Sequence, residues 1–150
     1  MGSDAGRALL VGAVTLVAAL AVLTWQTVRI PAHAPTRVVA ELRLAQAGAV
    51  LLAFSAAFLA GLGAASASPV AALDMALAVL ACGVALMALV RDPRTSLSWL
   101  AAAFLGRALI DVAHGIGGLP RVAPDAVLAG SALANLVAAG LCAGARTRHT

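Results

Sequence analysis

The stretch GRALIDVAHG, residues 106–115, places three side chains that could do chemistry inside an otherwise apolar segment. At about 100° per residue, Arg107, Asp111 and His114 fall at relative angles of about 0°, 40° and −20° on a helix, so they share one narrow stripe. A charged side chain within a membrane helix is costly and almost always faces protein or a wet cavity. The stripe therefore predicts a polar site between helices.

Two polar residues in neighbouring apolar segments match this stripe in depth. Asn135 lies near the middle of the last segment, level with Arg107. Asp74 lies about one turn into the third segment, near the level of Asp111 and His114. The sequence thus predicts a pocket between the third, fourth and fifth segments, in the outer half of the membrane.

Two interpretations of these five residues remain open. In the first, Arg107 and Asp111, four residues apart, pair with each other and with Asn135 as interhelical glue. Asp74 and His114 then stay wet near the membrane surface. In the second, the five side chains form a ligand site or a proton-coupling site, which is a common role for ionisable groups inside membranes.

The segments that must position these residues are long and apolar enough to cross a membrane. Hydrophobic residues make up 63% of the 150 residues and charged residues 11%, whereas soluble domains have about 45–50% and about 25%. Five apolar runs, each near the ~20 residues that a membrane helix needs, cover residues 8–28, 42–62, 70–90, 97–116 and 126–143. They are apolar on all sides, which favours helices over barrel strands. The sequence predicts an all-α, polytopic membrane protein, a single domain of about five transmembrane helices.

The arginines predict the orientation of the chain in the membrane. If five helices alternate in direction, one side carries Arg29, Arg37, Arg43, Arg91, Arg94, Arg146 and Arg148, and the other only Arg7 and Arg121. The positive-inside rule places the arginine-rich side in the cytoplasm. We therefore expect a bacterial plasma (inner) membrane protein with its N-terminus outside and its C-terminus in the cytoplasm. Cleavage of residues 8–28 as a signal peptide is disfavoured, because it would leave the arginine-rich first connection outside.

Polar residues at the start of the second run have a simple interfacial explanation. Glu41, Arg43 and Gln46 lie where this run meets the predicted cytoplasmic face, and Arg37 is four residues before Glu41. Side chains at this depth can snorkel to water. We expect an exposed Arg37–Glu41 pair without a functional role.

Small residues and cysteines point to packing and not to chemistry. Gly140 and Gly144 match the small-xxx-small pattern, which predicts close helix packing. Cys82 and Cys142 have no His or Cys at ligand spacing, so we expect no metal and no disulfide. No second histidine lies in a membrane segment to pair with His114 on a haem, so no cofactor is expected.

These observations favour one class of function and leave two others. The small size and the lack of a catalytic motif favour a non-enzymatic accessory or assembly subunit of a larger membrane complex. The alternative is a small oligomeric transporter or channel that uses the stripe for proton or anion coupling; a membrane enzyme is the least favoured class. The expected partners are the lipid bilayer and either other membrane chains or copies of this chain. Nucleic acid is not expected, because the arginines form no face.

The predicted orientation can be tested by cysteine labelling. In a background without Cys82 and Cys142, a cysteine placed within residues 61–68 should react with a membrane-impermeant maleimide on intact cells, because this connection is expected outside. A cysteine in the first connection, residues 31–35, serves as the control and should react only after the cells are opened. The reverse pattern would invert the topology.

Overall fold

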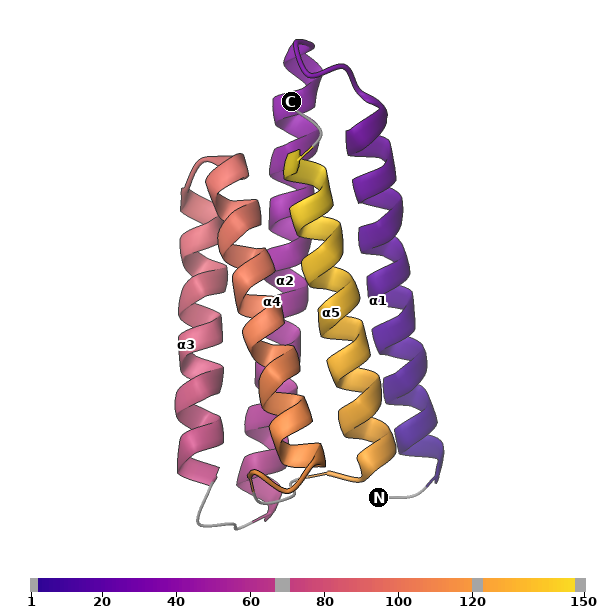
Figure 1. Ribbon diagram of the computed structural model, residues 1–150, viewed down its shortest axis with the longest axis vertical. Coiled ribbons are helices and arrows are strands. Elements are labelled where there is room, and N and C mark those ends of the chain that lie inside the picture. The colour runs from indigo at the N-terminus through magenta and orange to yellow at the C-terminus, as the bar shows by residue number, and fades with distance from the viewer. Residues whose placement is uncertain (1–2, 67–70, 120–122, 148–150) are drawn as a thin grey trace.

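The computed structural model describes residues 3–66, 71–119 and 123–147, and within these ranges the chain forms helices and no strand (Figure 1). The helices are α1 (Ser3–Arg29), α2 (Pro35–Ser66), α3 (Ala71–Val90), α4 (Pro93–Gly115) and α5 (Asp125–Thr147). Each contains a window long and apolar enough to cross a membrane. The prediction of an all-α bundle with five membrane-spanning helices is confirmed.

The largest difference from the predicted segments is at the start of α2. We expected this helix from residue 42, and it begins at Pro35. Proline suits the first position of a helix, because its fixed φ is helical and its missing N–H has no helical partner to lose. α4 also begins earlier than expected, at Pro93, and the carboxylate of Asp92 caps it by accepting from the backbone N–H groups of Arg94 and Thr95, each at 3.1 Å.

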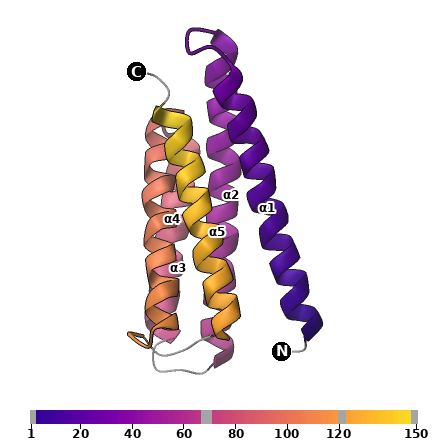
Figure 2. The ribbon, with the colours of Figure 1, turned by 45° about the vertical axis from the view of Figure 1, so that its right-hand side comes forward.

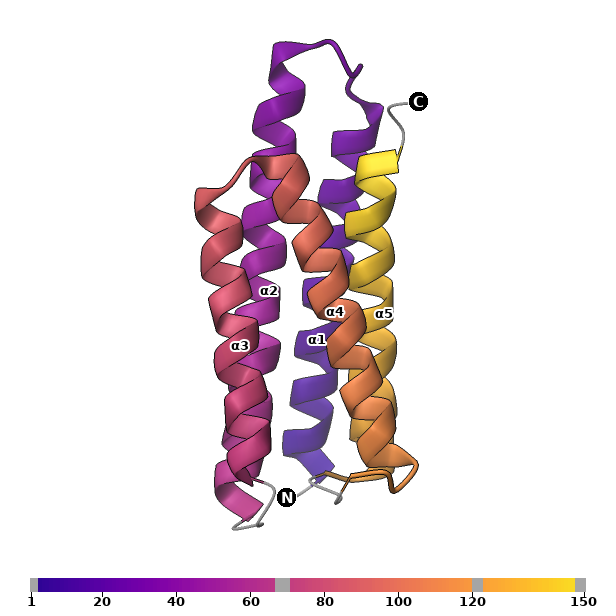
Figure 3. The same ribbon diagram turned by 60° about the vertical axis from the view of Figure 1, so that its left-hand side comes forward.

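The helices form a bundle in which α3 and α1 lie on opposite edges (Figure 1). α3 packs against α2 and α4 (Figure 3), and α5 packs extensively against α4. α1 packs against α2 and α5, but less extensively than α4 packs against α5. Figure 2 shows α1 leaning away from its neighbours toward its N-terminal end.

The core is built from a few large side chains and many small ones. Leu44, Leu52, Leu97, Leu100 and Phe104 are fully buried, and most of the other core residues are alanine. Small side chains allow membrane helices to approach closely, and close packing supplies much of their association. Large apolar side chains are exposed along the outside of the bundle, as expected of a surface that faces lipid.

Among the described glycines, the one with the tightest surroundings is Gly48, which the sequence patterns did not single out. A Cβ on Gly48 of α2 would lie 3.1 Å from Leu100 Cδ1 and 3.7 Å from Cys142 Sγ. A Cβ on Gly140 or Gly144 would meet no atom of the described residues within 4 Å. Close helix packing at Gly140 and Gly144 stays a prediction.

Arg37 and Glu41 are buried, contrary to the expectation of an exposed pair. Both residues are only 2% exposed. Arg37 Nε donates to Glu41 Oε1 at 2.8 Å. Its Nη1 donates to the carbonyl oxygens of Thr27 and Ile30, and its Nη2 donates to the carbonyl oxygen of Ala145 at 3.1 Å. The interpretation of Arg37 and Glu41 as side chains that snorkel to water is wrong, whereas Arg43 and Gln46 are exposed as expected.

These contacts join four helices at one end of the bundle. The last carbonyl groups of a helix have no helical partner and carry its negative partial charge. Arg37, on α2, binds such carbonyls at the ends of α1 and α5. The second carboxylate oxygen of Glu41 accepts from Arg94 Nε of α4 at 3.3 Å. We refer to Arg37, Glu41 and Arg94 as the arginine cluster.

The arginine cluster predicts a large effect for one substitution. Arg37→Ala removes the buried cation that balances the charge of Glu41, together with the donors that bind the carbonyls of α1 and α5, so we expect the free energy of unfolding to fall by about 3–5 kcal/mol. The measurement is the midpoint of SDS-induced unfolding in mixed micelles. Arg43→Ala, six residues along the same helix and exposed, is the matched control and should change stability by less than about 0.5 kcal/mol. Equal unfolding midpoints for the two variants would contradict a stabilising role of the arginine cluster.

Candidate functional site

The polar stripe of α4 is buried between helices, as predicted. Arg107, Asp111 and His114 are 4%, 2% and 0% exposed. The stripe faces α5 along one part of its length and α3 along the other. The five predicted site residues therefore fall into two groups.

The first group is centred on the carboxylate of Asp111. Arg107 Nη2 donates to its Oδ1 at 3.1 Å. Ser131 Oγ and Asn135 Nδ2, both from α5, donate to its Oδ2 at 2.7 Å and 3.1 Å. Asn135 Nδ2 also lies 3.4 Å from Ser131 Oγ. Both oxygens of Asp111 thus accept hydrogen bonds, and the carboxylate connects α4 to α5.

Ser131 is the member of this group that sequence reasoning missed. It precedes Asn135 by four residues, so the two side chains lie on the same face of α5. That spacing was available in the sequence. A serine inside an apolar helix is common, however, and only the contact with Asp111 distinguishes this one.

The second group is the pair of His114 and Asp74. His114 Nε2 lies 3.1 Å from Asp74 Oδ1, and both residues are 0% exposed. The interpretation in which these two side chains stay wet near the surface is therefore wrong. A hydrogen-bonded imidazole and carboxylate can hold one proton between them, and here they connect α4 to α3.

Some polar atoms of the site have no hydrogen-bond partner among the described residues. They are Arg107 Nε, Arg107 Nη1 and Asp74 Oδ2. Leaving a charged group partly unsatisfied in a buried position is costly. Sites that carry such a cost inside a membrane are commonly functional.

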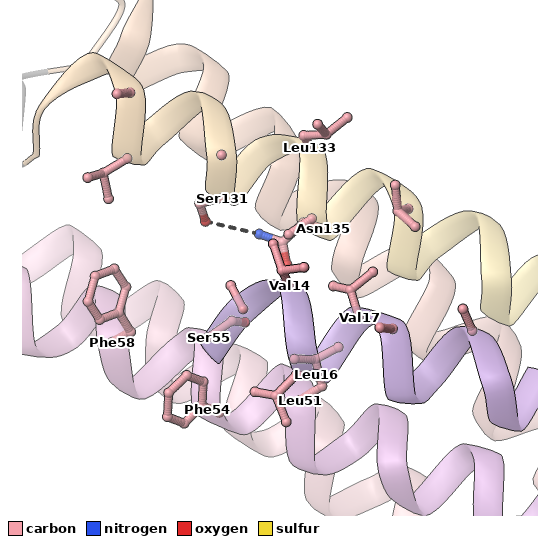
Figure 4. A pocket seen from close by; sticks show the side chains of 18 residues that line it. Val14, Leu16, Val17, Leu51, Phe54, Ser55, Phe58, Ser131, Leu133 and Asn135 are labelled. Carbon is pink, nitrogen blue, oxygen red and sulfur yellow. Dashed lines mark hydrogen bonds between the residues drawn. The ribbon is translucent and has the colours of Figure 1, made fainter. Parts of the chain in front are cut away.

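The cavity that adjoins the site does not lie between α3, α4 and α5. There Asp111 contacts Arg107 and Asn135, and Asp74 contacts His114. A cavity of about 670 Å³ lies instead between α1, α2 and α5, and Ser131 and Asn135 are part of its wall (Figure 4). The predicted location of the pocket is corrected accordingly. The difference arises because α1 diverges from α5 and presents alanines at residues 13, 18 and 21 to the space between them.

The cavity lining is almost entirely apolar. The large side chains include Val14, Leu16, Val17, Leu51, Phe54 and Phe58, and the polar ones are Ser55, Ser131 and Asn135. Ligand sites typically enclose about 300–1,000 Å³ and combine apolar walls with a few polar groups. The cavity has this size and this composition.

Two further observations on the described chain concern metal binding and the cysteines. Among the residues that the structure describes, no group of three His, Cys, Asp or Glu side chains is arranged to hold a metal ion. Cys82 and Cys142 are free thiols. Comparisons with protein-family models, with curated proteins and with solved structures find no match to this chain.

The Asp111 group predicts an interaction between two substitutions. Arg107→Ala leaves Asp111 buried without its positive partner, so the free energy of unfolding should fall by about 3–5 kcal/mol. Adding Asp111→Asn to Arg107→Ala should restore part of this loss, because no unpaired charge then remains buried. The measurement is again SDS-induced unfolding. Wild-type stability of Arg107→Ala alone would mean that Arg107 is hydrated in the membrane.

Proposed function

We propose that this protein is a small, non-enzymatic membrane transporter that takes up an apolar small molecule in the cavity between α1, α2 and α5. One observation carries the proposal: Ser131 and Asn135 are at once part of the cavity wall and hydrogen-bond donors to Asp111. The Arg107–Asp111 ion pair lies behind these two side chains, and their hydrogen bonds to Asp111 fix how they are oriented in the wall. Preorganised polar groups of this kind give a binding site its specificity.

The packing of α1 supports movement of a ligand into and out of the cavity. At its C-terminal end α1 is held by Arg37 through the carbonyls of Thr27 and Ile30. Toward its N-terminal end it diverges from the bundle (Figure 2). Elements with fewer packing contacts open more readily than the rest of a fold. In this proposal α1 is the movable wall, and it pivots at the arginine cluster.

The membrane and the orientation belong to the same proposal. We infer a bacterial plasma membrane, with the ends of α1 and α5 that meet at Arg37 on the cytoplasmic side. The distribution of arginines supports this orientation. Three further expectations stay predictions: proton or anion coupling by the α4 stripe, assembly into an oligomer, and contacts with other membrane chains.

Mild extraction distinguishes this function from that of an accessory subunit. The full-length protein, expressed at native level, is extracted in mild detergent and analysed by native mass spectrometry. We expect the protein alone or as a small homo-oligomer, with a bound small molecule. Recovery with a larger membrane protein at fixed stoichiometry and no bound small molecule would favour the accessory subunit instead.

Two variants test whether the bound molecule occupies the cavity. Ala134 belongs to the cavity lining, and Ala134→Phe adds bulk there without removing a hydrogen bond. This variant should lose the bound mass. Leu86→Phe on α3, where the side chain is 65% exposed, is the matched control and should retain it. Retention by both variants would contradict the assignment of the cavity as the binding site.

A further inference from the structure

The hydrogen-bond donors on the polar side chains of the cavity wall already donate to other groups of the protein. Ser55 Oγ donates to the carbonyl oxygen of Leu52 at 2.9 Å. Ser131 Oγ donates to Asp111 at 2.7 Å. The amide nitrogen of Asn135 lies within hydrogen-bond distance of both Asp111 and Ser131, so both of its hydrogens are used. The side chains of the wall therefore present acceptors and no free donor to the cavity.

The amide oxygen of Asn135 is the acceptor best placed to meet a ligand. An ionised carboxylate can only accept, so the NH₂ group of Asn135 must face Asp111 and its oxygen must face away. Among the described residues nothing donates to this oxygen. Asn135 is only 4% exposed, and Figure 4 shows its oxygen directed into the cavity, toward Val14.

The electrostatics of the wall favour a neutral ligand. Behind Asn135 the charges of Arg107 and Asp111 form a pair at 3.1 Å. This pair has no net charge, so it provides no compensation for a cation in the cavity. Burial of an uncompensated charge is strongly unfavourable.

We infer that the cavity binds a neutral, lipid-soluble alcohol. Its apolar body lies against the apolar lining, and its hydroxyl group donates to Asn135 Oδ1. A hydrocarbon chain without a donor fills the same space but leaves the buried oxygen unsatisfied, and sites that contain such a group discriminate against ligands that cannot pair with it. This inference rests on the proposed function, namely that the cavity takes up a small molecule.

Photolabelling in a bilayer tests the inference. The probe is hexadecanol that carries a diazirine on its alkyl chain, added to the full-length protein in lipid nanodiscs. After irradiation, adducts are located by peptide mass spectrometry, and unlabelled hexadecanol, hexadecyl methyl ether and hexadecylamine are added as competitors. We expect adducts on the cavity-lining parts of α1, α2 and α5. Hexadecanol should compete at about five- to tenfold lower concentration than the ether, the difference that one hydrogen bond makes.

Three variants test whether the preference for the alcohol over the ether depends on the cavity wall. Asn135→Leu should remove the difference between the alcohol and the ether, Ala134→Phe should remove the adducts, and Leu86→Phe should change neither. The comparison of competitors on the wild-type protein does not depend on whether Asn135→Leu folds.

The possible outcomes separate the two proposals. Equal competition by alcohol and ether, or stronger competition by the amine, overturns the assignment of a neutral alcohol and leaves a ligand cavity in place. Adducts absent from the cavity lining, or unaffected by Ala134→Phe, overturn the proposed function together with the inference that rests on it.

Discussion

The bundle depends on a guanidinium group buried where helix ends meet. In an apolar environment the last carbonyls of a helix have no water to bind, and a charged side chain has no solvent to stabilise it. Arg37 meets both requirements at once, because its donors bind carbonyls at the ends of α1 and α5 while Glu41 balances its charge. Arg94 extends the contact to α4. One end of the bundle is thereby closed by groups that are each costly to bury alone.

The other end of the bundle is held differently, and the cavity follows from this. Asp111 joins α4 to α5, and the Asp74–His114 pair joins α4 to α3. Among the hydrogen bonds of the described residues, none ties α1 to the bundle in this region. α1 can therefore diverge there, and the apolar cavity lies between it, α2 and α5 (Figure 2). Asp111 can both hold α4 against α5 and support the wall of a binding site, because the contacts that hold α5 also orient Asn135.

Several site contacts could be predicted because they depend on spacing along one helix or on depth in the membrane. Arg107 and Asp111 pair as their four-residue separation suggested, and Asn135 belongs to the same polar group through its hydrogen bond to Asp111. The pairing of Arg37 with Glu41 was predicted for the same reason, but their burial was not. That burial depends on the ends of α1 and α5, which are far from Arg37 in sequence. The tight approach at Gly48 likewise depends on Leu100 and Cys142 from other helices.

The sequence by itself determined that the chain is helical and long enough in five places to span a membrane, and that α4 carries a polar stripe. These properties follow from composition and local periodicity, which any folded arrangement of the chain must respect. Only the tertiary structure decided which faces meet. It buried Arg37, brought Ser131 to Asp111, and placed the cavity beside α1 and not beside α3. The burial of a side chain and the position of a cavity depend on neighbours that are distant in sequence. A helix that is apolar on all sides carries little information about which side faces which neighbour.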